Sequence, residues 1–260
     1  MQKAEAVRFT LLGGHDAVDD DRLRDLYTYP ATDSGAVVRG NAIVSLDGGA
    51  TTAGTSGGLG GPGDRRLFAT LRELADVIVV GAGTARAENY AGARMTAAQR
   101  RRRQECGQSE VPPIALVTRS GVLDRDLPVL ADTEVPPLLL TCANSAAGVR
   151  ARLGSAAEVL DCSGPDPDRV DLSRALRLLT DRGLRRVLTE GGPSLLGALI
   201  AEGLIDELCL TTAPIMVGGA ALRIATGADD VLARMRRAHV LTDEDGYLYS
   251  RYIVDHVSPQ

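Results

Sequence analysis

The sequence has almost no lysine. Lys3 is the only one in 260 residues, and it lies in the N-terminal tail. Schiff-base aldolases, pyridoxal-phosphate enzymes and Walker-type nucleotide hydrolases all depend on a placed ammonium group, so none of these classes is expected. Any phosphate group must therefore be held by arginine side chains and backbone N–H groups.

Cysteine and histidine are also scarce. The four cysteines, Cys106, Cys142, Cys162 and Cys209, are far apart, with no C-x-x-C pair and no histidine at metal-ligand spacing. Neither a disulfide framework nor a metal site is predicted, and a reducing compartment, the cytoplasm, is expected. The three histidines are isolated and are assigned no role.

Long apolar runs and excess positive charge are absent too. No uncharged apolar stretch reaches the roughly 18 residues that a membrane helix needs, and residues 1–10 carry charges where a signal peptide would be apolar. A net charge of −5 makes nucleic acid an unfavourable partner. We expect neither a membrane nor a nucleic-acid partner, and a small molecule as the ligand.

The pattern of apolar residues predicts one α/β domain over residues 36–257, preceded by an extension over residues 1–35. The extension is expected to be irregular apart from a short helix at 20–27. Beyond it, short apolar runs alternate with amphipathic segments, which is typical of a mostly parallel sheet with helices on both faces. Strands are predicted at 37–46, 76–81, 113–118, 137–142, 158–162, 186–190 and 207–213, and an antiparallel edge strand at 246–254. Helices are predicted at 64–74 with Asp64 as N-cap, between 142 and 158, at 171–182 and at 193–202, whereas 92–112 is predicted to be a surface loop.

Two strands end in glycine turns. The first reads VIVVGAGT over residues 77–84, and the second reads VLTEGGPS over residues 187–194. Glycines between a strand and a helix start let backbone N–H groups approach a phosphate, and Pro193 at a helix start leaves that end free for an anion. The third glycine of the G-x-G-x-x-G fingerprint is missing, which weakens a Rossmann dehydrogenase interpretation. Glu190 would lie at the carboxyl end of its strand, where it could pair with an aminopyrimidine edge or simply be solvated.

Four ordered motifs resemble those of a known family. They are SLDG at 45–48, GAGT at 81–84 followed by Glu88, EGGPSLL at 190–196 and APIMVGG at 213–219. Together they resemble the pyrimidine reductase domain of riboflavin biosynthesis, which occurs alone or joined to a deaminase, over residues 37 to about 225. The resemblance implies a dihydrofolate-reductase-like fold, NADPH as hydride donor, a homodimer, and a phosphoribosylaminopyrimidine as substrate.

The same resemblance assigns roles residue by residue. Glu190 and Asp47 are the candidate catalytic residues. The alternative role for Asp47 is to cap a turn. The candidate substrate contacts are Ser56, Arg72, Arg94 and Glu190. The candidate cofactor contacts are Gly81, Gly83, Thr84, Glu88, Thr118, Arg119, Ser120, Gly191, Gly192, Pro193 and Ser194. Arg119 is either the partner of a 2′-phosphate or a surface arginine, and Arg72 either joins the site or lies on the solvated face of its helix.

Three departures from the family pattern leave alternatives open. The zinc signature of the deaminase is missing, so deamination by that route is not expected. Asn41 stands where some relatives carry a lysine, and Gly57-Gly58 stands where some carry an aromatic residue. A stand-alone paralogue that reduces dihydrofolate or dihydropterin is therefore one alternative, and a non-catalytic nucleotide-binding module is another.

Overall fold

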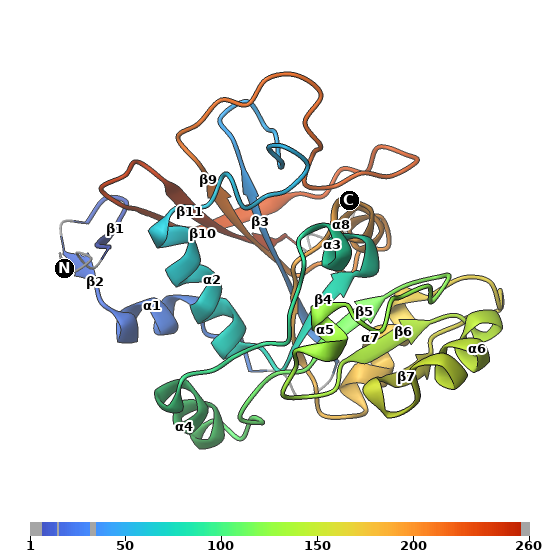
Figure 1. The fold of residues 1–260 in the computed structure, drawn as a ribbon. Helices are drawn as coiled ribbons and strands as arrows, with labels where there is room; N and C mark the ends of the chain where they lie inside the picture. The colour runs from blue at the N-terminus through green and yellow to red at the C-terminus, as the bar shows by residue number, and fades with distance from the viewer. Residues whose placement is uncertain (1–6, 15, 32–34, 256–260) are drawn as a thin grey trace.

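The computed structural model describes residues 7–14, 16–31 and 35–255. Within these residues a single 11-stranded sheet runs through the molecule in the order β2-β1-β10-β11-β9-β3-β8-β4-β5-β6-β7 (Figure 1). The strands from β9 to β7 in this order are parallel to one another. They are β3 (Val37–Val44), β4 (Val77–Gly81), β5 (Ile114–Val117), β6 (Leu138–Thr141), β7 (Glu158–Asp161), β8 (Arg186–Thr189) and β9 (Glu207–Thr212).

An antiparallel arm continues the sheet beyond β9. It consists of β1 (Phe9–Leu11), β2 (Ala17–Val18), β10 (Met235–Thr242) and β11 (Leu248–Val254). The prediction of a mostly parallel sheet with helices on both faces is confirmed.

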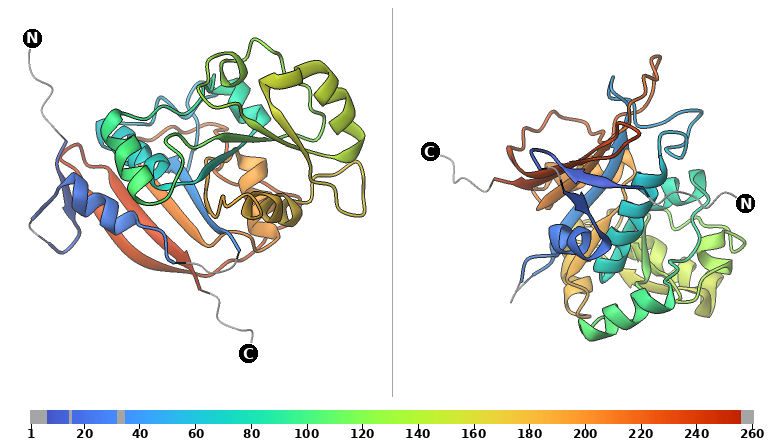
Figure 2. Two further views of the ribbon diagram at one scale, coloured as in Figure 1. Left: turned by 90° about the horizontal axis from the view of Figure 1, so that it is seen from below. Right: turned by 90° about the vertical axis from the view of Figure 1, so that its left-hand side faces the viewer.

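Alternation along the buried strands divides the core into two layers, because successive side chains of a strand point to opposite faces. Ile78 and Val80 of β4 face the layer under α1, α2 and α6, whereas Val77 and Val79 face the layer under α7 and α8. Figure 2 shows the sheet from two further directions. The helices are α1 (Asp20–Tyr27), α2 (Pro62–Leu74), α3 (Ala82–Ala87), α4 (Ala97–Glu105), α5 (Pro128–Ala131), α6 (Ala143–Leu153), the 3-10 turn η1 (Gly154–Ala156), α7 (Leu172–Thr180) and α8 (Pro193–Ala201).

Two predictions for local structure were wrong: the position of the N-cap of α2 and the absence of a helix in residues 92–112. The helix α2 begins at Pro62 with Gly61 as its N-cap, so Asp64 lies in its first turn. The stretch 92–112 contains α4, which Thr96 and Gln99 start with a capping box. Arg103 of α4 is 1% exposed and donates to the carbonyl groups of Glu73 and Ala75, so this stretch closes the C-terminal end of α2 instead of remaining a surface loop.

Two further predictions were wrong in the antiparallel arm. The strand β11 is not at an edge, because β10 pairs with its outer side. The sequence of β10 carries Arg236, Arg237 and His239, and this polar pattern did not indicate a strand. The predicted irregular extension contributes β1 and β2 to the sheet in addition to the expected helix α1.

None of the helices in the described residues is both long and apolar enough to span a bilayer.

Candidate active site

A cavity of about 810 Å³ opens at the carboxyl ends of the parallel strands β3, β4, β5 and β8. Ligands of open α/β sheets bind at this edge, where loops from neighbouring strands meet. Most of the residues predicted to form a site line the cavity: Ser56, Gly81, Gly83, Thr84, Glu88, Thr118, Arg119, Glu190, Gly191, Gly192, Pro193 and Ser194. The structure therefore brings together side chains that are more than 100 residues apart in the sequence.

The two glycine turns are in direct contact. The N–H of Gly81 donates to the carbonyl oxygen of Gly191 over 2.7 Å. A Cβ on Gly192 would overlap the Thr84 hydroxyl, so the two turns approach each other closely at this point. Since β4 and β8 are adjacent parallel strands, their turns form one continuous surface, which we call the glycine cradle and define as residues 81–84 and 191–194.

The glycine cradle has the properties of an anion site. The helix α8 starts at Pro193 with no side chain capping its first N–H groups, which helix geometry leaves without partners. Gly83 faces open space, so a ligand could approach its backbone closely. Arg119 and Arg169 line the same cavity and add positive charge. A diphosphate would fit the backbone donors and the charge of this surface.

Glu190 is held rigidly beside the cradle. Arg72 of α2 donates to both of its carboxylate oxygens over 2.7 Å each, and the hydroxyl of Tyr90 donates to one of them over 2.7 Å. The Glu190 side chain is 2% exposed and that of Arg72 is 18% exposed. Burial lowers the pKa of Arg72, but the Glu190 carboxylate outweighs burial and the pKa is raised, so the guanidinium stays charged.

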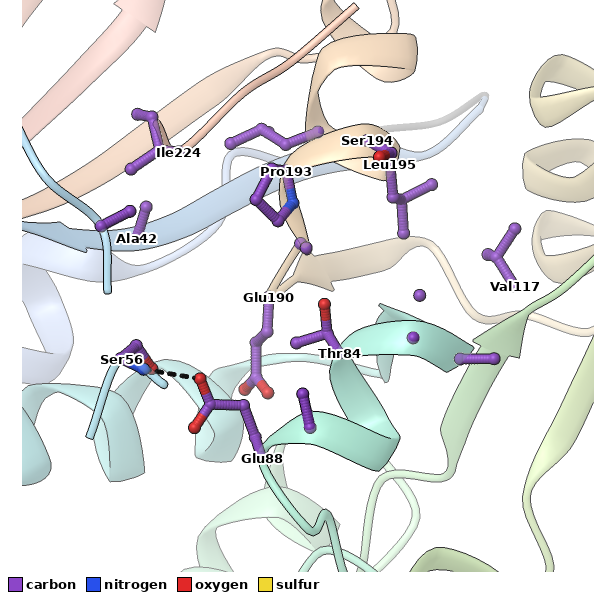
Figure 3. Close-up of a pocket in the computed structure, with 18 of the residues that line it drawn as sticks. Ala42, Ser56, Thr84, Glu88, Val117, Glu190, Pro193, Ser194, Leu195 and Ile224 are labelled. Carbon is purple, nitrogen blue, oxygen red and sulfur yellow. Dashed lines mark hydrogen bonds between the residues drawn. The ribbon is translucent and has the colours of Figure 1, made fainter. Parts of the chain in front are cut away.

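A second carboxylate ties the glycine-rich loop to α3. The N–H of Ser56 donates to Glu88 Oε1 over 2.7 Å, and Figure 3 shows this bond together with Glu190 and Thr84 in the same part of the cavity. The bond holds residues 52–60 over the end of α3. The loop thereby forms one wall of the cavity.

Four of the predicted site residues do not line the cavity. Arg72 acts on it only through Glu190. Asp47 is exposed and accepts from Ser45 Oγ and from the N–H groups of residues 217 and 218, which lower the pKa of its carboxyl to about 2. Arg94 forms an exposed ion pair with Asp132. Ser120 is exposed and accepts from the N–H of the residue at 122.

Sequence reasoning missed several residues that line the cavity. They include Asp64, Phe68, Tyr90 and Arg169. Only 3% of the chain is aromatic, so the rarity of Phe68 and Tyr90 was a signal that could have drawn attention to them. Arg169 lies in a loop before α7 and gave no signal.

The parallel sheet, its cleft and the buried carboxylate beside a glycine cradle define an α/β protein with a dihydrofolate-reductase-like fold and an enzyme-like site. The chain belongs to the RibD C-terminal domain family, whose model matches residues 36–249. The family predicted from the four motifs is confirmed.

Two of the relatives with curated names come from archaea. The chain is 30% identical over 212 residues to the 2,5-diamino-6-ribosylamino-4(3H)-pyrimidinone 5′-phosphate reductase of Methanothermobacter thermautotrophicus, covering 78% of this chain and 93% of the relative. It is 30% identical over 156 residues to the reductase of the same name from Archaeoglobus fulgidus, covering 60% of this chain and 69% of the relative.

Solved structures share the fold. A pyrimidine reductase-like protein from Corynebacterium diphtheriae superposes with a TM-score of 0.74 at 29% identity, covering 85% of this chain and 93% of that protein. The Saccharomyces cerevisiae riboflavin biosynthesis reductase Rib7 superposes with a TM-score of 0.65 at 15% identity, covering 87% and 93% respectively.

Proposed function

We propose that the chain is an NADPH-dependent pyrimidine reductase of riboflavin biosynthesis, acting on 5-amino-6-(5-phosphoribosylamino)uracil or a closely related aminopyrimidine. One observation carries the proposal: the glycine cradle and the buried carboxylate of Glu190 open into the same cavity. The names of the archaeal relatives support a reductase of this kind. The cytoplasmic location and the homodimer stay predictions.

The residues of the cavity fit a nicotinamide dinucleotide. The cradle would hold the diphosphate through the backbone N–H groups of residues 83, 84, 194 and 195, where no side chain caps the start of α8. Arg119 and Arg169 would face the phosphate on the adenosine ribose, since a planar guanidinium pairs with phosphate oxygens. When bound, the reduced nicotinamide supplies a hydride to the C=N carbon of the substrate.

The chain itself would position the substrate. Glu190, fixed by Arg72 and Tyr90, presents a carboxylate that can accept from the amino groups of a pyrimidine. Phe68 lines the cavity beside it and offers an aromatic face to the ring. Asp47 lies outside the cavity, so we assign the proton to Glu190 or to water and give Asp47 the task of holding the loop at 217–218.

The charge of the cavity favours a second candidate substrate. Arg72 is already paired with Glu190, and the arginines that line the cavity, Arg119 and Arg169, lie with the cofactor half. Asn41 lines the cavity without adding charge. A dihydropterin or dihydrofolate, whose pteridine ring carries no phosphate, is therefore the alternative substrate.

Steady-state NADPH oxidation with a panel of substrates tests the proposal. The phosphoribosylaminouracil or its close relatives should be reduced with a kcat/KM well above that of dihydropterin. The opposite order would select the second candidate. If no substrate caused NADPH oxidation, the result would favour the alternative that the chain is a non-catalytic nucleotide-binding module.

Replacing Arg119 with alanine should weaken NADPH binding more than NADH binding. A charged hydrogen bond to a phosphate contributes about 1.5–3 kcal/mol, so the dissociation constant for NADPH should rise roughly tenfold or more. Isothermal titration with both dinucleotides measures the ratio. Arg125→Ala, an exposed arginine outside the cavity, is the matched control, and an unchanged preference in Arg119→Ala would remove Arg119 from the phosphate site.

A further inference from the structure

The cavity continues from the glycine cradle along one side of α8. Ser194, Ala198 and Glu202 line it and are spaced four residues apart, so they share one face of the helix. Eight residues of helix rise about 12 Å, so Glu202 lies about two turns beyond the helix start that would hold the diphosphate. This length is comparable with the reach of an adenosine group from its phosphate, so Glu202 lies where the far edge of the base would be.

Apolar side chains surround the space between the cradle and Glu202. Val170, Leu172 and Leu195 line the cavity, and all three belong to the packed layer between the sheet and the helices α7 and α8. Val117 at the end of β5 lines the cavity near Leu195 (Figure 3). Aliphatic side chains of this kind suit a flat heterocycle, because binding removes apolar surface from water on both partners.

Glu202 offers a free hydrogen-bond acceptor at the end of this space. Its carboxylate forms no hydrogen bond and no ion pair with any other residue that the structure describes. Burial and the charge of Asp171 raise the pKa of Glu202, whereas the charge of Arg169 lowers it, so these three groups lie near one another. The carboxylate therefore keeps its acceptor capacity for a ligand.

A carboxylate at this position would distinguish purines by the group on carbon 6 of the ring. Adenine carries an amino group there, which donates hydrogen bonds, whereas hypoxanthine and guanine carry a carbonyl oxygen, which only accepts. A carbonyl oxygen that faced the carboxylate would meet like charge and find no donor. Arg119 and Arg169 can hold the 2′-phosphate at the same time, because that phosphate belongs to the ribose and not to the base.

We propose that Glu202 is a specificity-determining residue that accepts a hydrogen bond from the 6-amino group of the cofactor's adenine, and that it thereby selects an adenine dinucleotide over one with a 6-oxopurine. The inference rests on the proposed function only in requiring that a dinucleotide lies with its diphosphate on the glycine cradle. It adds recognition of the base to the recognition of the two phosphate groups.

The experiment measures binding without turnover, by isothermal titration of NADP⁺ and of its hypoxanthine analogue, in which an oxygen replaces the 6-amino group. Wild-type protein should bind NADP⁺ about tenfold more tightly than the analogue. Glu202→Ala should lose most of this preference, because NADP⁺ binds more weakly while the analogue does not. Asp181→Ala removes the carboxylate at the C-cap of α7, outside the cavity, and should keep the wild-type preference.

Glu202→Gln provides a second comparison. Its amide can accept from the adenine amino group and can also donate to the hypoxanthine oxygen, so the preference should narrow while both dinucleotides still bind. Equal affinity of wild-type protein for the two dinucleotides, or a wild-type preference in Glu202→Ala, would overturn the inference. Failure of the proposed function shows separately, as wild-type protein that prefers NADP⁺ as expected but oxidises no NADPH with any substrate.

Discussion

Replacing Arg72 with methionine is expected to destabilise the fold and abolish most of the activity. Methionine keeps much of the packing against Phe68, but Glu190, which is 2% exposed, loses the cation that compensates its burial. Breaking a buried ion pair from one side costs about 3–5 kcal/mol, and the partial exposure of Arg72 places the expected loss near the lower end. Misplacing the carboxylate should also lower kcat/KM by roughly 100-fold.

The double variant Arg72→Met with Glu190→Gln separates the two effects. Removing both charges should restore a large part of the free energy of unfolding, because no buried charge is left without a partner. The activity should not return, because the site still lacks the Glu190 carboxylate that positions the substrate. Urea denaturation and NADPH oxidation measure these quantities, and wild-type turnover in the double variant would exclude Glu190 from the mechanism.

Gly192→Ala should disrupt the glycine cradle. The added methyl group would overlap the Thr84 hydroxyl, so the Thr84 side chain must rotate or the two turns must move apart. Overpacking of this kind costs about 1–3 kcal/mol, and either movement should raise the dissociation constant of NADPH at least tenfold. Thermal unfolding and dinucleotide titration give the two values.

The double variant Gly192→Ala with Thr84→Ala tests the cause. Alanine at 84 removes the hydroxyl that the new methyl group would meet, so the melting temperature should recover toward that of wild type. NADPH affinity should recover only in part, because Thr84 lines the cavity itself. A single Gly192→Ala variant with wild-type affinity would show that the contact between the turns does not matter for binding.

The parallel half of the fold and the cradle could be predicted from the sequence because their signals are local. Short apolar runs that end in glycine, such as the one ending at Gly81, mark both the buried strand and its turn. Since parallel strands present their carboxyl ends at one edge, two such turns already implied a shared site. The hydrogen bond between Gly81 and Gly191 shows that the two turns do lie side by side.

The rest of the site depends on distant contacts that leave no periodic signal. Arg72 could have faced solvent on helical spacing alone, and only the position of α2 against β8 brings it to Glu190. Tyr90 follows α3 in a loop, where no pattern fixes its direction. Asp47 lies beyond the end of β3, and its carboxylate accepts from Ser45 Oγ and from the N–H groups of residues 217 and 218, a contact across the chain that no local pattern indicates.

The most direct test of the central claim is isothermal titration of NADPH into two matched glycine variants. Gly83 and Gly148 both lie in helices, and a Cβ at either position would contact no protein atom within 4 Å. Each alanine should therefore stabilise the fold by about 0.5–1 kcal/mol. If the cradle holds the diphosphate, Gly83→Ala binds NADPH at least tenfold more weakly and Gly148→Ala binds it as wild type does; equal affinity in both variants would contradict the account.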